Sequence, residues 1–233
     1  MLSPFPDPWP LLQAYHRVRE PLYRQIIADV GLAGAPLILD AGCGDGFYSR
    51  LLADPAAGGV RVVAVDLNPG VLNREPNAHR IDWCLADFER AGLRRDAFDA
   101  IWLCRAMHSA LDPARRLAAL AALLRSGGKL IDIENDFEYY PILSLLTDFS
   151  HRVREAHYQY LKSRCADGTS LERYHAARHL PSWLDRIGLR QVSLRTRRSP
   201  KRVLMIGWRA VTDEAHNNTV RLHTFCLARS MEG

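Results

Sequence analysis

The sequence lacks several features that would place it in a specialised class of protein. It contains no uninterrupted apolar run approaching the roughly 20 residues that a membrane-spanning helix needs. Residues 1–8 include no basic segment followed by an apolar stretch, which is the pattern of a secretion signal. Internal repeats and low-complexity segments are also missing. These absences lead us to expect a globular protein in the cytoplasm with no membrane partner.

Cysteines are few and scattered. The chain has 5 of them, an odd number, and none forms a Cys-x-x-Cys pair. No histidine stands at ligand spacing from a cysteine pair. The pattern therefore indicates neither a disulfide framework nor a zinc site, and we expect no metal cofactor.

Composition is that of an ordinary globular chain, but positive charge is unevenly distributed. Of the 233 residues, 48% are hydrophobic and 24% charged, with a net charge of +5. Residues 151–210 carry 14 Lys and Arg but only 4 Asp and Glu. Such an excess is typical of a solvated surface, and it also suits an anionic substrate or a nucleic acid.

Short apolar runs alternate with helical patterns through the first half of the chain. One helix is expected over 112–125, where Asp112 is a suitable N-cap, Pro113 fits the first helical position and Gly127-Gly128 would end it. This alternation predicts parallel strands joined by right-handed crossovers, with helices on both faces of the sheet. The expected strands are 37–39, 60–65, 81–85, 98–104 and 129–133.

The flanking segments have different patterns. Residues 9–30 are expected to be helical, and residues 189–199 and 201–212 to form a hairpin. The apolar residues at helical spacing in the first segment are Leu12, Tyr15, Val18, Leu22 and Ile26.

A glycine-rich turn follows the first expected strand. Its sequence runs from Leu39 as Leu-Asp-Ala-Gly-Cys-Gly-Asp-Gly, and glycines allow the backbone to turn tightly and to approach a ligand. A dinucleotide site would need a third glycine where Phe47 stands. Asp40 and Asp45 would also repel a pyrophosphate. The loop therefore favours a cationic ligand.

Acidic residues end the next two strands. Asp66 comes about 20 residues after the loop, where an acid typically accepts the hydroxyls of a ribose. Asp87 could accept from an exocyclic amine, and Phe88 and Leu67 would supply apolar walls for a purine. Together with the loop, these residues predict a nucleoside site at the carboxyl edge of the sheet.

At this point the chain resembles the class I S-adenosylmethionine-dependent methyltransferases. The motifs that carry the resemblance lie at 39–46, 65–67, 86–88, 98–102 and 123–131, in the order and spacing of that family. The resemblance implies an α/β, Rossmann-like fold: a seven-stranded, mostly parallel sheet with an antiparallel last strand, helices on both faces and a helical lid insertion. It also implies S-adenosylmethionine as cofactor and S-adenosylhomocysteine as product.

The expected cofactor site combines the loop with the strand ends. In the family, Gly42 and Gly44 would pass under the methionyl part, Asp66 would hold the ribose, and Asp87 with Phe88 would contact the adenine. The full set of expected cofactor-binding residues is Tyr15, Asp40, Gly42, Cys43, Gly44, Asp66, Leu67, Asp87, Phe88, Cys104 and Arg105.

The acceptor is expected to be a small molecule. Residues 103–109 lack the Asn/Asp-Pro-Pro-aromatic tetrapeptide of enzymes that methylate exocyclic or amide nitrogens. This stretch and residues 173–184 are similar instead to the branch containing ubiquinone- and menaquinone-pathway and natural-product O-methyltransferases, so we expect O-methylation in specialised metabolism. Arg173 could bind an anionic group of the acceptor. The candidate bases are His108, Tyr139, Tyr140 and His175.

These expectations describe one methyltransferase domain over residues 1–233. Its parts are an N-terminal helical cover (1–36), the cofactor-binding core (37–135), a substrate lid (136–180), the last helix and hairpin (181–212) and a tail (213–233) that could be a strand in a homodimer or a frayed end.

Two other functions stay open. One is a tRNA or rRNA methyltransferase that grips nucleic acid through residues 195–202, although this basic segment is short and has no interleaved aromatics for base stacking. The other keeps the fold without methyl transfer, as an adaptor subunit or a decarboxylase or cyclase that uses S-adenosylmethionine.

Overall fold

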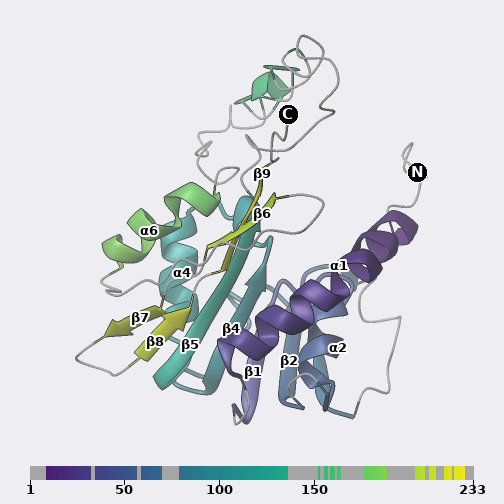
Figure 1. Ribbon diagram of the computed structural model, residues 1–233. Coiled ribbons are helices and arrows are strands. Elements are labelled where there is room, and N and C mark those ends of the chain that lie inside the picture. The colour runs from purple at the N-terminus through teal and green to yellow at the C-terminus, as the bar shows by residue number, and fades with distance from the viewer. Residues whose placement is uncertain are drawn as a thin grey trace.

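A central sheet covered by helices on both faces forms the body of the molecule (Figure 1). The structure, a computed structural model, describes residues 9–32, 35–56, 59–69, 79–135 and 176–187, short helical pieces within 152–163, and four strands within 203–228. All structural statements below refer to these residues.

Five parallel strands make up the centre of the sheet, in the order β3-β2-β1-β4-β5. They confirm the five predicted strand regions and the Rossmann-like core. Their bounds are β1 (Leu37–Ala41), β2 (Arg61–Asp66), β3 (Ile81–Leu85), β4 (Phe98–Cys104) and β5 (Leu124–Asn135).

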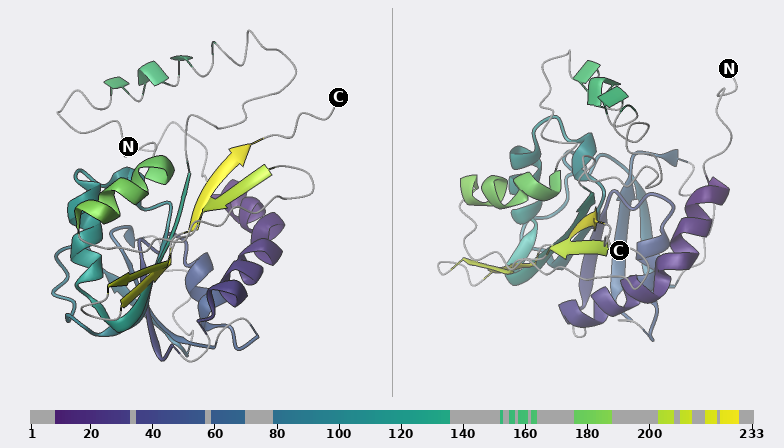
Figure 2. Two further views of the ribbon diagram at one scale, coloured as in Figure 1. Left: turned by 60° about the vertical axis from the view of Figure 1, so that its left-hand side comes forward. Right: turned by 45° about the horizontal axis from the view of Figure 1, so that its top comes forward.

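Helices cover both faces of the sheet, as predicted (Figure 2), and each face has its own apolar core. On one face, α1 (Trp9–Val30) and α2 (Phe47–Ala53) pack on strand residues such as Ile38 and Trp102. On the other, α4 (Pro113–Ala121) and α6 (Ala176–Arg186) pack on residues such as Leu39 and Leu103. Alternate residues of one strand thus serve opposite cores, as the pleat of a strand requires.

The buried face of α1 agrees with the predicted apolar stripe in part. Ile26 is buried and Leu22 packs against the core, but Val18 is 80% exposed. The buried residues lie at spacings of three, four and seven, and they include a polar one, which an apolar pattern does not reveal. They are His16, Tyr23, Ile26, Ile27 and Val30.

The helix predicted over 112–125 ends earlier, and β5 begins earlier, than the sequence indicated. Leu123 is drawn into the sheet because its carbonyl accepts hydrogen bonds from the N–H groups of Ala97 (3.0 Å) and Phe98 (3.0 Å). Gly127 then adopts φ 77° within β5, where the β4–β5 register shifts. The glycine pair therefore forms an irregularity inside a strand and does not end a helix.

Two short strands near the C-terminus extend the sheet beyond β5. They are β6 (Val203–Gly207) and β9 (His223–Ala228), and a separate pair is formed by β7 (Ala210–Asp213) and β8 (Asn218–Arg221). The predicted antiparallel last strand is not confirmed: β9 runs parallel to β5, and the antiparallel strand is β6 at the edge. The sequence reading missed β9 because it treated 213–233 as a tail, although the β7–β8 pair turns the chain back into the sheet.

Most of the proposed lid (136–180) and the first arm and turn of the predicted hairpin (189–202) lie outside the described residues. β6 pairs with β9, so the second arm at least has a partner other than the predicted one. None of the helices in the described part of the chain has both the length and the apolarity to cross a bilayer.

The N-cap of α4 gives a direct test of this local structure. The carboxylate of Asp112 accepts a hydrogen bond from the N–H of Arg115 at 3.0 Å. Asp112→Ala removes that bond and is expected to lower the free energy of unfolding by about 1 kcal/mol, measured by urea denaturation. Leu111→Ala next to it, at a side chain that is 70% exposed, is the matched control and should change stability by less than about 0.5 kcal/mol. Equal effects of the two substitutions would contradict the capping role.

Candidate functional site

The ends of neighbouring parallel strands bring the predicted site residues to one edge of the sheet. Ala41 at the end of β1 is level with Val65 of β2 and with Leu103 of β4. The chain segments that follow these residues therefore begin side by side. In open α/β sheets this carboxyl edge is where ligands bind.

The glycine-rich loop after β1 is fastened to β2 through its backbone. The N–H groups of Gly42 and Cys43 both donate to the carbonyl of Val65, at 2.8 and 3.1 Å. Gly42 has φ 75°, and a Cβ there would lie 3.2 Å from the Cβ of Ala106 after β4. Gly44 has φ 58°, and nothing lies within 4 Å of the position its Cβ would take. At Gly42 the glycine-rich loop thus lies close to the loop that follows β4. At Gly44 there is space beside the backbone of the glycine-rich loop.

Asp66 holds the loop to the end of β2. One carboxylate oxygen accepts the N–H of Gly44 at 2.8 Å, and the other accepts the N–H of Asn68 at 2.8 Å. The side chain is half-buried. Because each carboxylate oxygen can accept more than one hydrogen bond, Asp66 keeps capacity for the hydroxyls of a ribose.

Asp87 and Phe88 form the next part of the edge. Asp87 accepts the N–H of Glu89 at 3.0 Å, so it stabilises a turn in addition to any ligand contact. The Phe88 ring lies beside the loop, 3.9 Å from where a Cβ on Gly42 would be. Leu67 is 68% exposed. These side chains give the edge an open apolar surface next to the glycines.

Arg116 on α4 fixes Phe88 in place. Its guanidinium lies 5.2 Å from the centre of the Phe88 ring, donates to Glu89 at 2.6 Å and donates to the carbonyl of Ala106 at 2.8 Å. One side chain therefore ties the loop after β3 to the loop after β4. The sequence analysis did not single out Arg116, because its position on the helix carries no motif.

Asp40 and the two cysteines of the predicted cofactor set point into the protein. Asp40 is 1% exposed and accepts a hydrogen bond from the Ser49 hydroxyl at 2.5 Å. Burial raises the pKa of the Cys43 thiol, and it raises the pKa of the Cys104 thiol to about 12. Both thiols are therefore protonated near neutral pH, and a ligand would meet the backbone here before these side chains.

The remaining predicted residues are described only in part or not at all. Tyr15 lies on α1 and His108 in the short helix η1 (Met107–Ser109), but the positions of their side chains are outside the described part. The other predicted catalytic and substrate-binding residues lie outside the described residues altogether; they are Tyr139, Tyr140, Arg173 and His175. Their roles stay predictions.

A histidine that the sequence analysis did not name lies at the loop. His16 of α1 is 3% exposed, and its ring contacts the carboxylate of Asp45 at 3.1 Å and the guanidinium of Arg105 at 3.2 Å. The ring also stacks on Phe47 with centroids 4.2 Å apart. Its position seven residues before Tyr23 on the buried face was the only sequence signal, and it became recognisable once that face was known.

The loop carries two acids whose pKa values move in opposite directions. Burial raises the pKa of Asp40 to about 7, and the negative charges of Asp66 and Asp45 add to this shift, which the Ser49 bond partly offsets. Burial acts in the same direction on Asp45, but the His16 hydrogen bond and charge outweigh it and lower the pKa of that carboxyl. At neutral pH Asp45 is therefore an anion, while burial favours the protonated form of Asp40.

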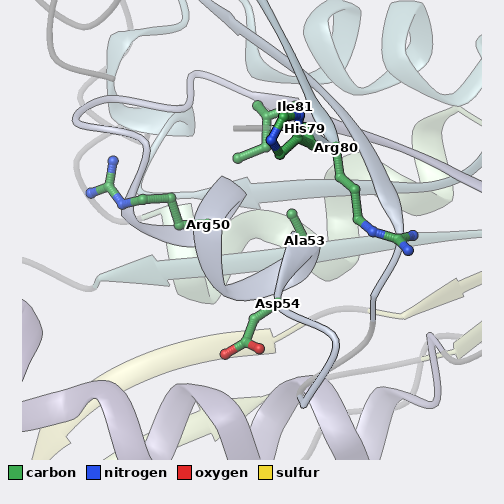
Figure 3. A pocket seen from close by; sticks show the side chains of 6 residues that line it. All are labelled: Arg50, Ala53, Asp54, His79, Arg80 and Ile81. Carbon is green, nitrogen blue, oxygen red and sulfur yellow. The ribbon is translucent and has the colours of Figure 1, made fainter. Parts of the chain in front are cut away.

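A separate hollow of about 240 Å³ lies between the end of α2 and the start of β3. Its charged side chains already have partners: Asp54 pairs with Arg24 at 2.7 Å, and Arg80 donates to the carbonyl of Gly59 at 2.6 Å. Figure 3 shows Arg50 and Arg80 pointing to opposite sides. The hollow is at the amino end of β3, away from the strand ends described above, and it is not the functional site.

No group of three or more His, Cys, Asp or Glu side chains with metal-binding geometry occurs among the residues whose placement is described.

The raised pKa of Asp40 predicts a pH-dependent stability. Between its ordinary value of 3.8 and about 7, the folded state keeps a proton that the unfolded chain releases. Stability from this group is therefore fully present below pH 4 and is lost as pH rises toward 7 and just above. We expect wild-type stability to fall relative to Asp40→Asn over this window, by at most about 4 kcal/mol.

Urea denaturation of both proteins between pH 4 and pH 8 measures this difference. Asp185→Asn, at an exposed carboxylate on α6, is the control, and its stability should stay parallel to that of the wild type. A constant difference between wild type and Asp40→Asn across the range would show that Asp40 is ionised in the folded protein.

Comparisons with known proteins agree with this geometry. Residues 39–132 match the family described as a methyltransferase domain. The demethylmenaquinone methyltransferase of Renibacterium salmoninarum is 26% identical over 175 residues, which cover 72% of this chain and 69% of that protein. The ubiquinone biosynthesis O-methyltransferase of Aromatoleum aromaticum is 32% identical over 120 residues, which cover 48% of this chain and 50% of that protein. The chain spans about half the length of several of the curated relatives it matches.

A solved structure shows the same fold. A SAM-dependent methyltransferase from Aquifex aeolicus aligns over 82% of this chain and 93% of its own, with a TM-score of 0.59 and 16% identity. The family match covers the loop, β2, β3, β4 and most of β5, which are the elements that build the edge described above. Residues 39–132 are therefore similar to the methyltransferase domain family, and the chain has the fold of that solved SAM-dependent methyltransferase.

Proposed function

We propose that the protein transfers the methyl group of S-adenosylmethionine to an oxygen atom of a small-molecule acceptor in specialised metabolism. The observation that carries the proposal is the bond between Gly44 and Asp66, which joins an open glycine backbone to a carboxylate with remaining acceptor capacity. The relatives named above act in quinone biosynthesis by their names, which supports an aromatic acceptor.

The residues at the edge fit the cofactor. A nucleoside needs an acceptor for its ribose and an apolar wall for its base, and Asp66 and Phe88 provide them within one edge of the sheet. The amino-acid end needs a close backbone approach, which the open side of Gly44 allows. A sulfonium cation also suits a loop that carries Asp45 as an anion.

Methyl transfer requires the protein to align the methyl group with the acceptor and to exclude water. When bound, S-adenosylmethionine supplies a methyl group whose bond to sulfur breaks as a bond to the acceptor oxygen forms. The protein must hold acceptor and methyl group in line and exclude competing water. The proton of a hydroxyl acceptor would pass to a base, for which His108, Tyr139, Tyr140 and His175 are our candidates.

Acceptor recognition is proposed for the segment after β5. Arg173 would bind a carboxylate or phosphate of the acceptor by paired hydrogen bonds. An acceptor of this kind needs no nucleic-acid partner, and a homodimer through the C-terminal strands stays a further proposal.

Substitution of Asp66 tests the cofactor site. Asp66→Ala removes the ribose acceptor and the Gly44 anchor, so its affinity for S-adenosylhomocysteine is expected to fall by roughly 10-fold to 100-fold, measured by isothermal titration calorimetry. Asp66→Asn retains one acceptor and should fall less. Asp82→Ala changes an exposed carboxylate on β3 that pairs with Arg61, and its affinity should match the wild type. Unchanged affinity in Asp66→Ala would contradict the site.

Methyl transfer itself is tested with S-adenosylmethionine carrying a labelled methyl group. The acceptors are a catechol, a carboxylated phenol, a demethylmenaquinone analogue and bulk tRNA, and Asp66→Ala is the inactive control. Label on a phenolic oxygen supports the proposal. Label on a ring carbon would correct the acceptor atom, label on tRNA would favour the RNA alternative, and binding without transfer to any acceptor would favour a non-methylating protein.

A further inference from the structure

Two loops that approach the glycine-rich loop come from strands that are not neighbours in the sheet. The strand order β3-β2-β1-β4 places β2 and β1 between β3 and β4, which at the usual strand spacing of about 4.8 Å is a separation of roughly 14 Å. A Cβ on Gly42 would nevertheless contact a residue from each loop, Ala106 at 3.2 Å and Phe88 at 3.9 Å. The loops after β3 and β4 therefore converge at the glycine-rich loop.

One side chain of α4 bonds to both of these loops. Nε of Arg116 donates to Glu89 after β3 at 2.6 Å, and Nη1 donates to the carbonyl of Ala106 after β4 at 2.8 Å. The same Nη1 donates to the Ser109 hydroxyl at 2.8 Å. The guanidinium carbon lies over the Phe88 ring, 5.2 Å from its centre. The two residues that approach the glycine-rich loop are thus both held by Arg116.

The helix and the protein surface restrict the movement of this side chain. The N–H of Arg116 donates to the carbonyl of Asp112 at 3.0 Å, and the following residue, Leu117, is fully buried in the core. The Arg116 side chain is 12% exposed, so water has little access to its hydrogen bonds. Because a guanidinium is rigid and planar, a movement of one loop turns the whole group and disturbs its bonds to the other loop.

The Ser109 contact extends this arrangement toward the proposed acceptor side. Ser109 is the last residue of η1 and directly follows the candidate base His108. Its hydroxyl accepts from Arg116 and donates to the carbonyl of Ala106 at 2.8 Å, which joins the end of η1 to the residue before its start. The wall proposed for adenine at Phe88 and the segment that carries His108 are therefore attached to one guanidinium.

We propose that Arg116 is a positioning residue that couples the adenine end of the cofactor site to η1. Adenine packed on Phe88 restrains the ring, and Arg116 transmits this restraint to the segment after β4, so the bound cofactor orders the place beside the acceptor. By linkage, an acceptor that orders η1 tightens the binding of the cofactor by the same factor. The inference rests on the proposed use of S-adenosylmethionine.

Three single substitutions measure the coupling through cofactor affinity. Arg116→Met keeps a stem of similar shape without charge or donors, Glu89→Ala removes the partner after β3, and Ser109→Ala removes the hydroxyl partner after β4. Calorimetry with S-adenosylhomocysteine is expected to show an affinity lower by about tenfold in Arg116→Met and by about threefold in each of the others. Arg115→Met, at an exposed position of the same helix, is the matched control and should stay within about twofold of the wild type.

Combined substitutions show whether the two loops act through Arg116. Glu89 and Ser109 lie on different loops and share this guanidinium as a partner. Glu89→Ala with Ser109→Ala is therefore expected to lose at most about fivefold in affinity, less than the product of the single losses. In an Arg116→Met background neither substitution should lower the affinity further. Glu89→Gln keeps an oxygen that accepts from Nε and should retain most of the affinity. Fully multiplicative losses, or unchanged affinity in Arg116→Met, would overturn the inference.

Amide hydrogen exchange at saturating S-adenosylhomocysteine tests the effect on η1 directly. In the wild type the ligand should slow exchange over both 42–48 and 106–110. In Arg116→Met the protection of 42–48 should remain, while that of 106–110 falls by about half or more. General destabilisation would lower protection in both segments alike. Equal protection of 106–110 in the two proteins, equal loss in both segments, or no protection of 106–110 in the wild type would each overturn the coupling.

Two further controls keep the outcomes distinct. If Arg116→Met does not fold, Glu89→Ala and Ser109→Ala carry both measurements, because they leave α4 unchanged, and multiplicative losses with unchanged protection of 106–110 would overturn the inference. A wild type that binds S-adenosylhomocysteine, with Arg116→Met binding it equally well, would remove only this inference. No binding by the wild type would remove the proposed function as well.

Discussion

The hydrogen bond from the Gly44 N–H to the Asp66 carboxylate joins the loop after β1 to the end of β2, and the proposed cofactor site depends on it. The N–H groups of Gly42 and Cys43 in the loop also donate to the carbonyl of Val65, so the first turn of the loop is attached to β2. A turn with left-handed residues at Gly42 and Gly44 would otherwise be free to take other conformations. Asp66 thus fixes the conformation of the loop, and in the proposed function the same carboxylate would also accept the ribose hydroxyls.

The same loop shows how burial and hydrogen bonding assign different states to two neighbouring acids. Asp40 lies beneath the loop with Ser49, and burial raises its pKa to about 7. Asp45 is bonded to His16, which lowers its pKa despite partial burial. The Asp45 anion is therefore bonded to α1, while the Asp40 carboxyl is bonded to Ser49 of α2. If Asp40 were also ionised, the two negative charges would repel each other.

The sequence was sufficient for the features that depend on local chemistry. Strand and helix alternation, the glycine loop and Asp66 follow from residue types at fixed spacing, and the structure places them as expected. The sequence was insufficient for the features whose structure is determined by contacts between residues far apart in the chain. The role of His16 depends on a loop 29 residues away, and Gly127 was assigned to a helix end because the pairing of Leu123 with β4 has no sequence signature. The direction of β9 depends on how the β7–β8 pair turns the chain, which no local pattern records.

Helices from both faces of the sheet contact two adjacent residues of the loop after β4. His16 of α1 contacts the side chain of Arg105, and Arg116 of α4 contacts the carbonyl of Ala106. Since Arg116 also holds Phe88, and His16 also holds Asp45, each helix links the loop after β4 to one side of the proposed cofactor site. The segment after Ala106 leads into η1, which contains His108. The loop after β4 is thus held from both faces of the sheet, between the proposed cofactor residues and the segment that carries the candidate base His108.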